Sequence, residues 1–385
     1  MRLRALLARA ALAAALASPA LADAAGASLA SGRVPSPGPL AADREATPSP
    51  AAQQDVPPPD PPSAVDLARR EAIERGLAYL AKTQGHDGSF PRPKGAGVQH
   101  APIGIASLGA LAFLAGGSSP GRGPYGRETQ RLVEYLLNHV DLAPKSPRYG
   151  YCSEQGDPMS RMHGHGYATL ALAEAFGMGP RDPRLERALV AAVHCIERSQ
   201  SPEGGWYYEP RPSGHEGSVT ICLVQALRAA RNAGVRVEPA VVHRAEEYVL
   251  ALRNDAGLFR YQLGSDQSSV ALTAAAIATL NAAGTYDDKI IRDAVDVVWR
   301  QLVKRGEGGP DKFPFYERLY LAQAFYQLAD RSHFQRWFGP EVERLLAAQA
   351  ADGSWHDPEY GDAYATASTV LVLALPDGLL PIFQR

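Results

Sequence analysis

Apolar residues recur at helical spacing along most of this chain, and the pattern distinguishes two kinds of helix. In the first kind, apolar residues follow each other three or four positions apart with charged residues between them; Ile73, Leu77 and Leu80, flanked by Glu74 and Lys82, are an example. That spacing predicts an amphipathic helix with one face in the core and the other in water. Five more such segments lie around residues 132–137, 189–196, 242–249, 291–302 and 342–346.

The second kind of helix is apolar around most of its circumference and rich in alanine, leucine, threonine and glycine. A helix of this composition is expected to be buried on all sides. Four of these helices are followed by a glycine, which accepts the left-handed conformation that ends a helix. The segments alternate with the amphipathic ones, at residues 103–115, 166–176, 219–233, 268–283, 315–329 and 363–375.

A short phrase recurs in the loops between the two kinds of helix. Each copy has glutamine, an acidic residue three positions later, then glycine, then serine or glycine, then an aromatic residue. The copies contain Gln84, Gly88 and Phe90; Gln200, Gly204 and Trp206; and Gln349, Gly353 and Trp355. Weaker matches place glycine at positions 150, 257 and 308. Repetition at about 50 residues indicates a repeat architecture.

The repeat predicts the fold. Pairs of one amphipathic and one buried helix can bury their apolar surfaces if the buried helices form an inner ring and the amphipathic helices an outer ring. We therefore predict an all-α protein, an (α/α)6 toroid. An open solenoid is the alternative, but it would leave the inner helices more exposed and would need polar caps.

The recurring phrase resembles the QW motif of the terpene cyclase and protein prenyltransferase superfamily. Over residues 67–385 the chain is similar to bacterial exported proteins built from prenyltransferase/squalene-oxidase repeats. Further segments that carry the resemblance are His163–Thr169, Ser218–Cys222, Arg228–Gly234 and Leu380–Arg385. The resemblance implies that the glutamine amide packs on the aromatic ring and ties adjacent repeats together, which is a structural role.

The catalytic motifs of these relatives are absent from the sequence. Neither Asp-x-Asp-Asp nor Asp-Cys-Thr-Ala-Glu, which supply the acid of triterpene cyclases, occurs; Asp287 and Asp288 precede an outer helix. No cysteine has aspartate two positions before it, as the zinc site of protein prenyltransferases requires. No cofactor is therefore expected, zinc included, and classical cyclase or prenyltransferase activity does not follow from the fold.

The amino-terminal part of the chain has the composition of a targeting segment and a tether. Residues 1–22 carry Arg2 and Arg4 before an apolar stretch and an Ala-x-Ala site, which predicts a secretory signal peptide. Residues 23–65 are rich in proline, alanine and serine and are expected to be a disordered linker. The toroid is thus predicted over residues 66–385 of a protein exported to the periplasm or the extracellular space.

The charge of the chain narrows the kinds of partner that it can bind, and its cysteine content bears on disulfide pairing. The net charge of −2, without a block of basic residues, argues against nucleic acid or an anionic membrane surface. No membrane span is expected, unless the signal stays uncleaved as an anchor. Cys152, Cys195 and Cys222 are an odd number, so an exported chain could pair two of them, and the sequence leaves the pairing open.

Candidate functional residues lie near the starts of the inner helices, which all point toward one rim of a toroid. The amino-terminal ends of helices carry partial positive charge and unpaired N–H groups. Polar rim candidates are His100, His163, His165, His215, Glu216, Asp266, Glu317 and Tyr364, with Asp266 and Asp362 also expected as helix N-caps. Aromatic candidates on the same side are Tyr167, Tyr316 and Tyr320.

His163 and His165 are the best polar pair among these residues. A His-x-His pair in a loop or strand could bind a metal, with Asp157 as a weak third ligand. A hydrogen-bonded structural histidine is the alternative, and a pocket acid or base is a third, because imidazole titrates near neutrality.

Cys152, Glu154 and Gln155 match the Cys-x-Glu-Gln spacing of thioester domains in complement proteins and alpha-2-macroglobulins, which share the toroid fold. The residues that usually follow and the large flanking domains are absent.

We therefore expect an exported toroid that binds a small molecule, such as a lipid, or a protein partner at its central cavity. The main alternative is an enzyme acting on an isoprenoid or other lipid through His165 and an acid such as Glu216. Weaker alternatives are a thioester domain and a carbohydrate-active enzyme, which would need two carboxylates facing the cavity about 5–10 Å apart; Glu216, Asp266 and Glu317 could supply them.

Overall fold

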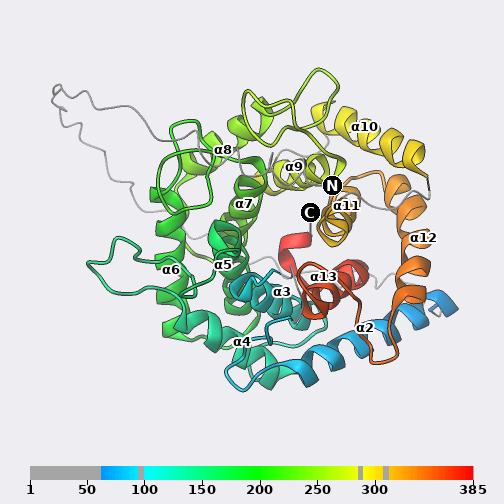
Figure 1. Cartoon of the computed structure of the whole chain (residues 1–385), viewed down its shortest axis with the longest axis horizontal. Helices are drawn as coiled ribbons and strands as arrows, with labels where there is room; N and C mark the ends of the chain where they lie inside the picture. The colour runs from blue at the N-terminus through cyan, green and yellow to red at the C-terminus, as the bar shows by residue number, and fades with distance from the viewer. Residues whose placement is uncertain (1–61, 94–98, 285–288, 307–311, 385) are drawn as a thin grey trace, which may run out of the picture. The chain divides into compact units, whose positions relative to one another are not determined.

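The computed structural model describes residues 62–93, 99–284, 289–306 and 312–384. Within them the chain forms twelve α-helices that alternate between an outer and an inner position (Figure 1). The outer helices are α2 (Ala64–Thr83), α4 (Gly126–Asn138), α6 (Pro183–Arg198), α8 (Pro239–Ala251), α10 (Lys289–Arg305) and α12 (Ser332–Ala348). The inner helices are α3 (Pro102–Ala115), α5 (Arg161–Met178), α7 (Gly217–Asn232), α9 (Val270–Ala283), α11 (Pro314–Tyr326) and α13 (Asp362–Ala374).

The inner helices form a closed ring. Each packs on the next in chain order, and α13 packs back on α3. The outer ring closes as well, because α12, the last outer helix, packs on α2, the first (Figure 1). These contacts confirm the predicted all-α toroid and exclude an open solenoid.

Burial follows the predicted difference between the two kinds of helix. In the inner helix α3 every residue except Gly104 is buried, whereas the outer helix α4 buries only one side. Small residues allow close packing in the inner ring: a Cβ on Gly109 of α3 would lie only 2.5 Å from the Phe90 ring. The inner ring is therefore a packed core whose middle is filled with side chains.

The recurring loops join neighbouring repeats through hydrogen bonds that glutamine side chains donate to backbone carbonyls. Gln200 Nε2 donates to the Gly204 carbonyl in its own loop at 2.8 Å and to the Val241 carbonyl of α8 at 2.9 Å. Gln84 makes the same pair of bonds with Gly88 and with Glu128 of α4. Each glutamine thus fixes its loop on the outer helix of the next repeat.

The third copy of the phrase closes the ring. Gln349 Nε2 donates to the Gly353 carbonyl and to the Ala72 carbonyl of α2, both at 2.9 Å, although Ala72 is 277 positions away in the chain. The Trp355 indole donates to the Leu345 carbonyl of α12 at 2.8 Å. The last repeat is held on the first by the same bonds that join sequential repeats.

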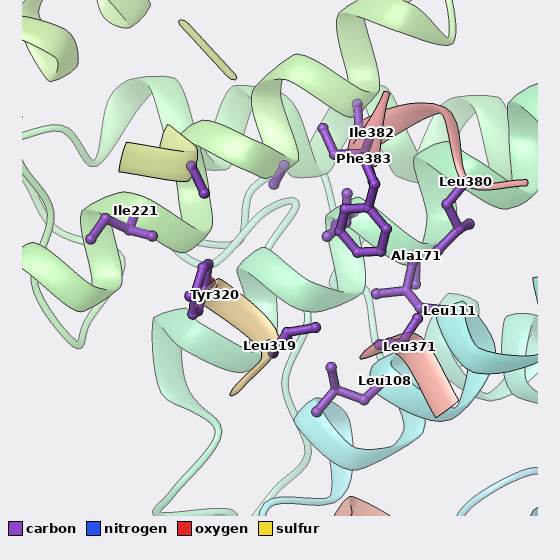
Figure 2. Close-up of a cluster of buried hydrophobic side chains, with 14 of the residues drawn as sticks. Leu108, Leu111, Ala171, Ile221, Leu319, Tyr320, Leu371, Leu380, Ile382 and Phe383 are labelled. Carbon is purple, nitrogen blue, oxygen red and sulfur yellow. The ribbon is translucent and has the colours of Figure 1, made fainter. Parts of the chain in front are cut away.

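The carboxyl-terminal residues fill one end of the inner ring. After α13 come two short 3-10 helices, η1 (Leu375–Asp377) and η2 (Pro381–Phe383), and η2 packs on α7. Figure 2 shows Leu380, Ile382 and Phe383 among the apolar side chains of the inner helices. Arg228 of α7 donates to the Gln384 carbonyl at 3.1 Å. The end of the ring where the inner helices finish is therefore closed by the chain itself.

Two predictions concern the amino-terminal part of the chain. The signal peptide at 1–22 and all but the last residues of the linker lie outside the described residues. Helix α2 begins at Ala64, where the Ser63 side chain accepts the Asp66 N–H, so helix formation starts before the predicted boundary at residue 66. In the part of the chain that the structure describes, no helix has both the length and the apolar character needed to cross a membrane.

A buried carboxyl group beneath the carboxyl-terminal residues predicts a pH dependence of stability. Glu174 of α5 is 3% exposed, and burial raises its pKa to about 7, against the Ile382 backbone and the Arg228 charge, which lower it. Because the pKa in the folded state lies above the unfolded value, the folded state binds more protons, and stability falls as pH rises from about 4.5 to 7. The Glu174→Gln variant should lose this decrease, which amounts to at most about 3 kcal/mol.

Urea unfolding at pH 5 and pH 8, followed by circular dichroism, measures the effect. The matched control is Glu71→Gln, which alters an exposed carboxyl group on α2. An unchanged difference between the two pH values in Glu174→Gln would contradict the assignment.

Candidate functional site

The amino-terminal halves of the inner helices bring four tyrosines together opposite the closed end of the ring. We call Tyr167 of α5, Tyr316 and Tyr320 of α11, and Tyr364 of α13 the tyrosine cluster. The hydroxyl groups of Tyr167 and Tyr320 are 3.3 Å apart, and the rings of Tyr316 and Tyr320 are 4.6 Å apart. Three of the four side chains are partly exposed, and only Tyr320 is fully buried. Burial raises the pKa of all four phenols, so they stay protonated hydrogen-bond donors.

A hydrogen-bonded chain of three polar side chains adjoins the cluster. His163 Nε2 of α5 lies 2.9 Å from Ser218 Oγ of α7, and Ser218 Oγ donates to Glu216 Oε2 at 2.6 Å. Glu216 is the N-cap of α7 and also accepts the Val219 N–H at 3.0 Å. His163 and Tyr167 are four residues apart in α5, so their side chains share one face of the helix, and this places the hydrogen-bonded chain beside the tyrosine cluster. Burial raises the pKa of Tyr316, and the charge of Glu216 acts in the same direction.

The close approach of α5 and α7 makes this chain possible. A Cβ on Gly166 would lie 2.7 Å from Cys222 Sγ, so only glycine allows the two helices to come this close. Cys222 Sγ in turn donates to the His163 carbonyl at 3.5 Å. His163 and Ser218, 55 positions apart in sequence, are thereby brought within hydrogen-bonding distance.

Burial shifts the pKa values of both end groups of the chain. It lowers the pKa of His163 to about 4, with the nearby Arg161 charge acting in the same direction. It raises the pKa of Glu216, while the hydrogen bonds from Ser218 and Val219 act in the opposite direction. His163 is therefore a neutral imidazole at pH 7, and groups with pKa values shifted in this way are candidates for a functional role.

His165 has a structural role in this geometry. It is completely buried, and its Nδ1 accepts the Cys152 N–H at 3.1 Å. In three other repeats a threonine hydroxyl accepts the corresponding loop N–H: Thr220 from Trp206, Thr273 from Phe259 and Thr366 from Trp355, each at 3.0 Å. The structure therefore places the predicted catalytic candidate His165 where no ligand can reach it, and burial lowers its pKa to about 3.

The histidine pair is not a metal site in this geometry. Both residues lie in α5, not in a loop, and their rings bond to different elements. Asp157 uses one carboxylate oxygen to accept the N–H groups of Met159 and Ser160 just before α5. Among the described residues, no group of three or more His, Cys, Asp or Glu side chains could hold a metal ion.

The other rim candidates are spread over different surroundings. His100 lies two residues before the start of α3 and is partly exposed, and Tyr364 belongs to the tyrosine cluster. His215 Nδ1 bonds to the Tyr248 hydroxyl of the outer helix α8 at 3.0 Å. Asp266 is exposed in the loop before α9. Of the rim candidates, the structure therefore links His163 and Glu216, through Ser218, whereas the His215 ring bonds to the outer helix α8 and Asp266 is exposed.

Glu317 faces away from the cluster. It pairs with Arg305 of α10 at 2.6 Å and lines a cavity of about 760 Å³ between α10, α11 and α12. With Asp266 exposed and Glu317 paired in this cavity, the three acids expected for a carbohydrate-active enzyme do not converge. The predicted N-caps are also wrong: the Ser269 hydroxyl caps α9, and Asp362 is the first residue of α13, after Gly361.

The thioester arrangement does not form either. Cys152 is 1% exposed and burial raises its pKa, whereas Gln155 is exposed. Glu154 accepts the Tyr135 hydroxyl. The sulfur and the glutamine side chain that would form the thioester therefore lie in different environments. All three cysteines are buried and free, so no pairing is present.

Sequence reasoning missed Ser218 as a site residue. It appears in the segment that resembles the repeat family, but a serine in the first turn of a helix is ordinary and gave no signal of its own. The usable signal is its position two residues after Glu216, since an N-cap and the second helical residue can share a hydrogen bond.

Comparison with known proteins supports the fold at low sequence identity. No protein-family model matches the chain, and no curated protein matches it. A structure of the type II terpene cyclase MstE from Scytonema, in complex with its substrate geranylgeranyl dihydroxybenzoate, superposes with a TM-score of 0.54 and 18% identity, over 82% of this chain and 99% of that one. The GH76A α-1,6-mannanase of a Salegentibacter species superposes with a TM-score of 0.60 and 13% identity, over 81% of this chain and 99% of that one. A D-mannose isomerase superposes with a TM-score of 0.57 and 11% identity, over 82% of this chain and 100% of that one.

These similarities define the class of protein. The chain is an α/α toroid, a fold that terpene cyclases share with carbohydrate-active enzymes. Identities of this size show the fold and leave the chemistry to the site.

Proposed function

We propose that this protein is an exported toroid of prenyltransferase/squalene-oxidase-type repeats that binds a small molecule with an apolar body and a hydroxyl group at the tyrosine cluster. The observation that carries the proposal is the convergence of partly exposed side chains from α5, α7, α11 and α13 at one end of the inner ring. The other end is filled by the carboxyl-terminal residues. Export rests on residues 1–22, and amino-terminal sequencing of the mature protein should start at Asp23.

The side chains at the cluster favour an uncharged ligand. Phenol rings offer large apolar faces with a hydroxyl at the tip. Burial lowers the pKa of His163 to about 4, so its imidazole is uncharged at pH 7. An isoprenoid alcohol or a similar lipid has the matching chemistry. The substrate in the MstE complex, geranylgeranyl dihydroxybenzoate, also carries an isoprenoid chain, which supports this class of ligand.

Binding of geranylgeraniol and of mannotriose to the purified full chain, measured by isothermal titration calorimetry, tests the proposal. We expect geranylgeraniol to bind. The double variant Tyr167→Ala/Tyr364→Ala should weaken binding about tenfold or more, because the loss of each aromatic ring removes contact area with the ligand. Tyr326→Ala, which truncates a tyrosine at the opposite end of α11, is the matched control and should bind normally.

Two outcomes would contradict the proposal. Mannotriose binding that depends on the same tyrosines would replace the lipid by a sugar. Failure of both ligands to bind the folded protein would remove the ligand site.

A further inference from the structure

We propose that the chain His163–Ser218–Glu216 is a proton relay that makes His163 Nδ1 a general base toward a molecule bound at the tyrosine cluster. This inference rests on the proposed ligand site and adds an activity to it. It also replaces His165, which is buried, by His163, which is partly exposed.

The direction of the hydrogen bonds assigns every proton in the chain. Ser218 has one hydroxyl proton and donates it to Glu216 Oε2. Its oxygen must then accept from His163, so Nε2 carries the imidazole proton and Nδ1 carries the lone pair. Nδ1 has no hydrogen-bond partner among the described residues. The free lone pair is thus connected through two hydrogen bonds to a buried carboxylate.

The proton transfers balance along this chain. When a ligand proton passes to Nδ1, the Nε2 proton passes to Ser218 Oγ and the Ser218 proton passes to Glu216 Oε2. The imidazole stays neutral throughout, Glu216 becomes a neutral acid, and the negative charge moves to the ligand. Glu216, whose ionised form is desolvated, is the group that finally takes the proton. After the product leaves, Nδ1 gives its proton to water and the other two shifts reverse.

A comparison within the chain shows that an inner helix can be capped at this position without a carboxylate. Ser269 occupies the corresponding N-cap of α9, and its hydroxyl accepts the Leu272 N–H at 3.0 Å, as Glu216 accepts the Val219 N–H. Both caps lie four residues before the threonine that binds the loop aromatic, Thr273 in one repeat and Thr220 in the other. A neutral serine therefore caps the helix without the cost of burying a carboxylate. The glutamate at this position is explained by its use in the relay.

The probe for the test is 5-nitrobenzisoxazole, a flat aromatic molecule that reports general bases. Removal of its carbon-bound proton forms a nitrile as the N–O bond breaks, and the product is a coloured phenolate. The reaction needs no oxidant, reductant or second substrate. Binding is measured separately with the unreactive analogue 5-nitroindazole, so that loss of binding and loss of proton transfer are distinguishable.

We expect the wild-type chain to open the probe faster than buffer does, and His163→Ala to lower kcat about 100-fold with KM little changed. Ser218→Ala should lower kcat about tenfold and Ser218→Thr, which keeps the hydroxyl group, should restore it. Glu216→Gln keeps an oxygen for the helix cap but cannot take the proton, so its kcat should also fall about tenfold. The matched control is His194→Ala, which removes an exposed histidine of the outer helix α6.

Four results would overturn the relay. Wild type that binds 5-nitroindazole without opening the probe has a ligand site and no base. Equal rates in wild type and His163→Ala place the base elsewhere. A Ser218→Thr variant as slow as Ser218→Ala would show that Ser218 acts only through packing. Absence of both 5-nitroindazole binding and probe turnover would contradict the ligand site together with the relay.

Discussion

Replacing Trp355 by alanine is expected to lower the free energy of unfolding by about 4 kcal/mol. Trp355 is 2% exposed, and its indole donates to the Leu345 carbonyl of α12 at 2.8 Å. Its ring lies against Gly76 of α2, where an added Cβ would come within 3.0 Å of it. Removing the ring thus leaves a cavity where the last repeat meets the first, and unpairs a backbone carbonyl. Urea unfolding followed by circular dichroism measures the loss.

The Trp355→Phe variant separates packing from hydrogen bonding. Phe90 fills the same position in the first repeat, so the fold accepts a phenyl ring there. We expect this variant to lose only about 1 kcal/mol, mainly from the unpaired Leu345 carbonyl. A loss below about 1.5 kcal/mol for Trp355→Ala would show that the junction between last and first repeats contributes little.

The Gly353→Ala variant should lower the free energy of unfolding by about 3 kcal/mol or more, because the added Cβ would disturb the backbone and not the packing of core side chains. Gly353 has φ +91°, and a Cβ would collide with the backbone carbonyl of Arg75 in α2. Backbone cannot move aside as a flexible side chain can, so the loop must leave its place on α2. The bonds of Gln349 to Ala72 and Gly353 would be weakened with it.

The matched control is Gly234→Ala. Gly234 has almost the same φ, +90°, but a Cβ there would meet nothing within 4 Å. This variant should cost only about 1–2 kcal/mol, the penalty for a left-handed alanine. Equal losses in the two variants would mean that conformation alone, and not contact with α2, explains the glycine. Both unfolding curves come from the same urea titration.

Helical periodicity was enough to predict all six inner helices, and five of them begin within three residues of the predicted start. The exception is α5, which begins at Arg161, five residues before the predicted start at 166. Its first turn has no apolar period, Ser160 makes no side-chain cap, and Arg161 has a positive φ of 44°. Because helix starts depend on such local features, the predicted helix began after His163 and His165, and a metal site that a loop or strand could form stayed among the alternatives for this pair.

The similarity to a cyclase, a mannanase and an isomerase shows why the fold could not supply the reaction. A toroid presents the starts of its inner helices at one end whatever residues stand there. The candidate site depends on which side chains the loops and first turns carry, and those are not set by the repeat.

The alternation of apolar and amphipathic segments, and the glycine and glutamine of each loop, already implied a closed ring of helical hairpins, because these features recur with the helical period and act locally. Only the folded ring decided the role of each histidine. Successive helix residues turn by about 100°, so His163 and His165 point to different neighbours. His165 meets the Cys152 N–H, and His163 meets Ser218, 55 positions along the chain. That meeting depends on how closely α5 approaches α7, a distance that packing sets and local sequence does not encode.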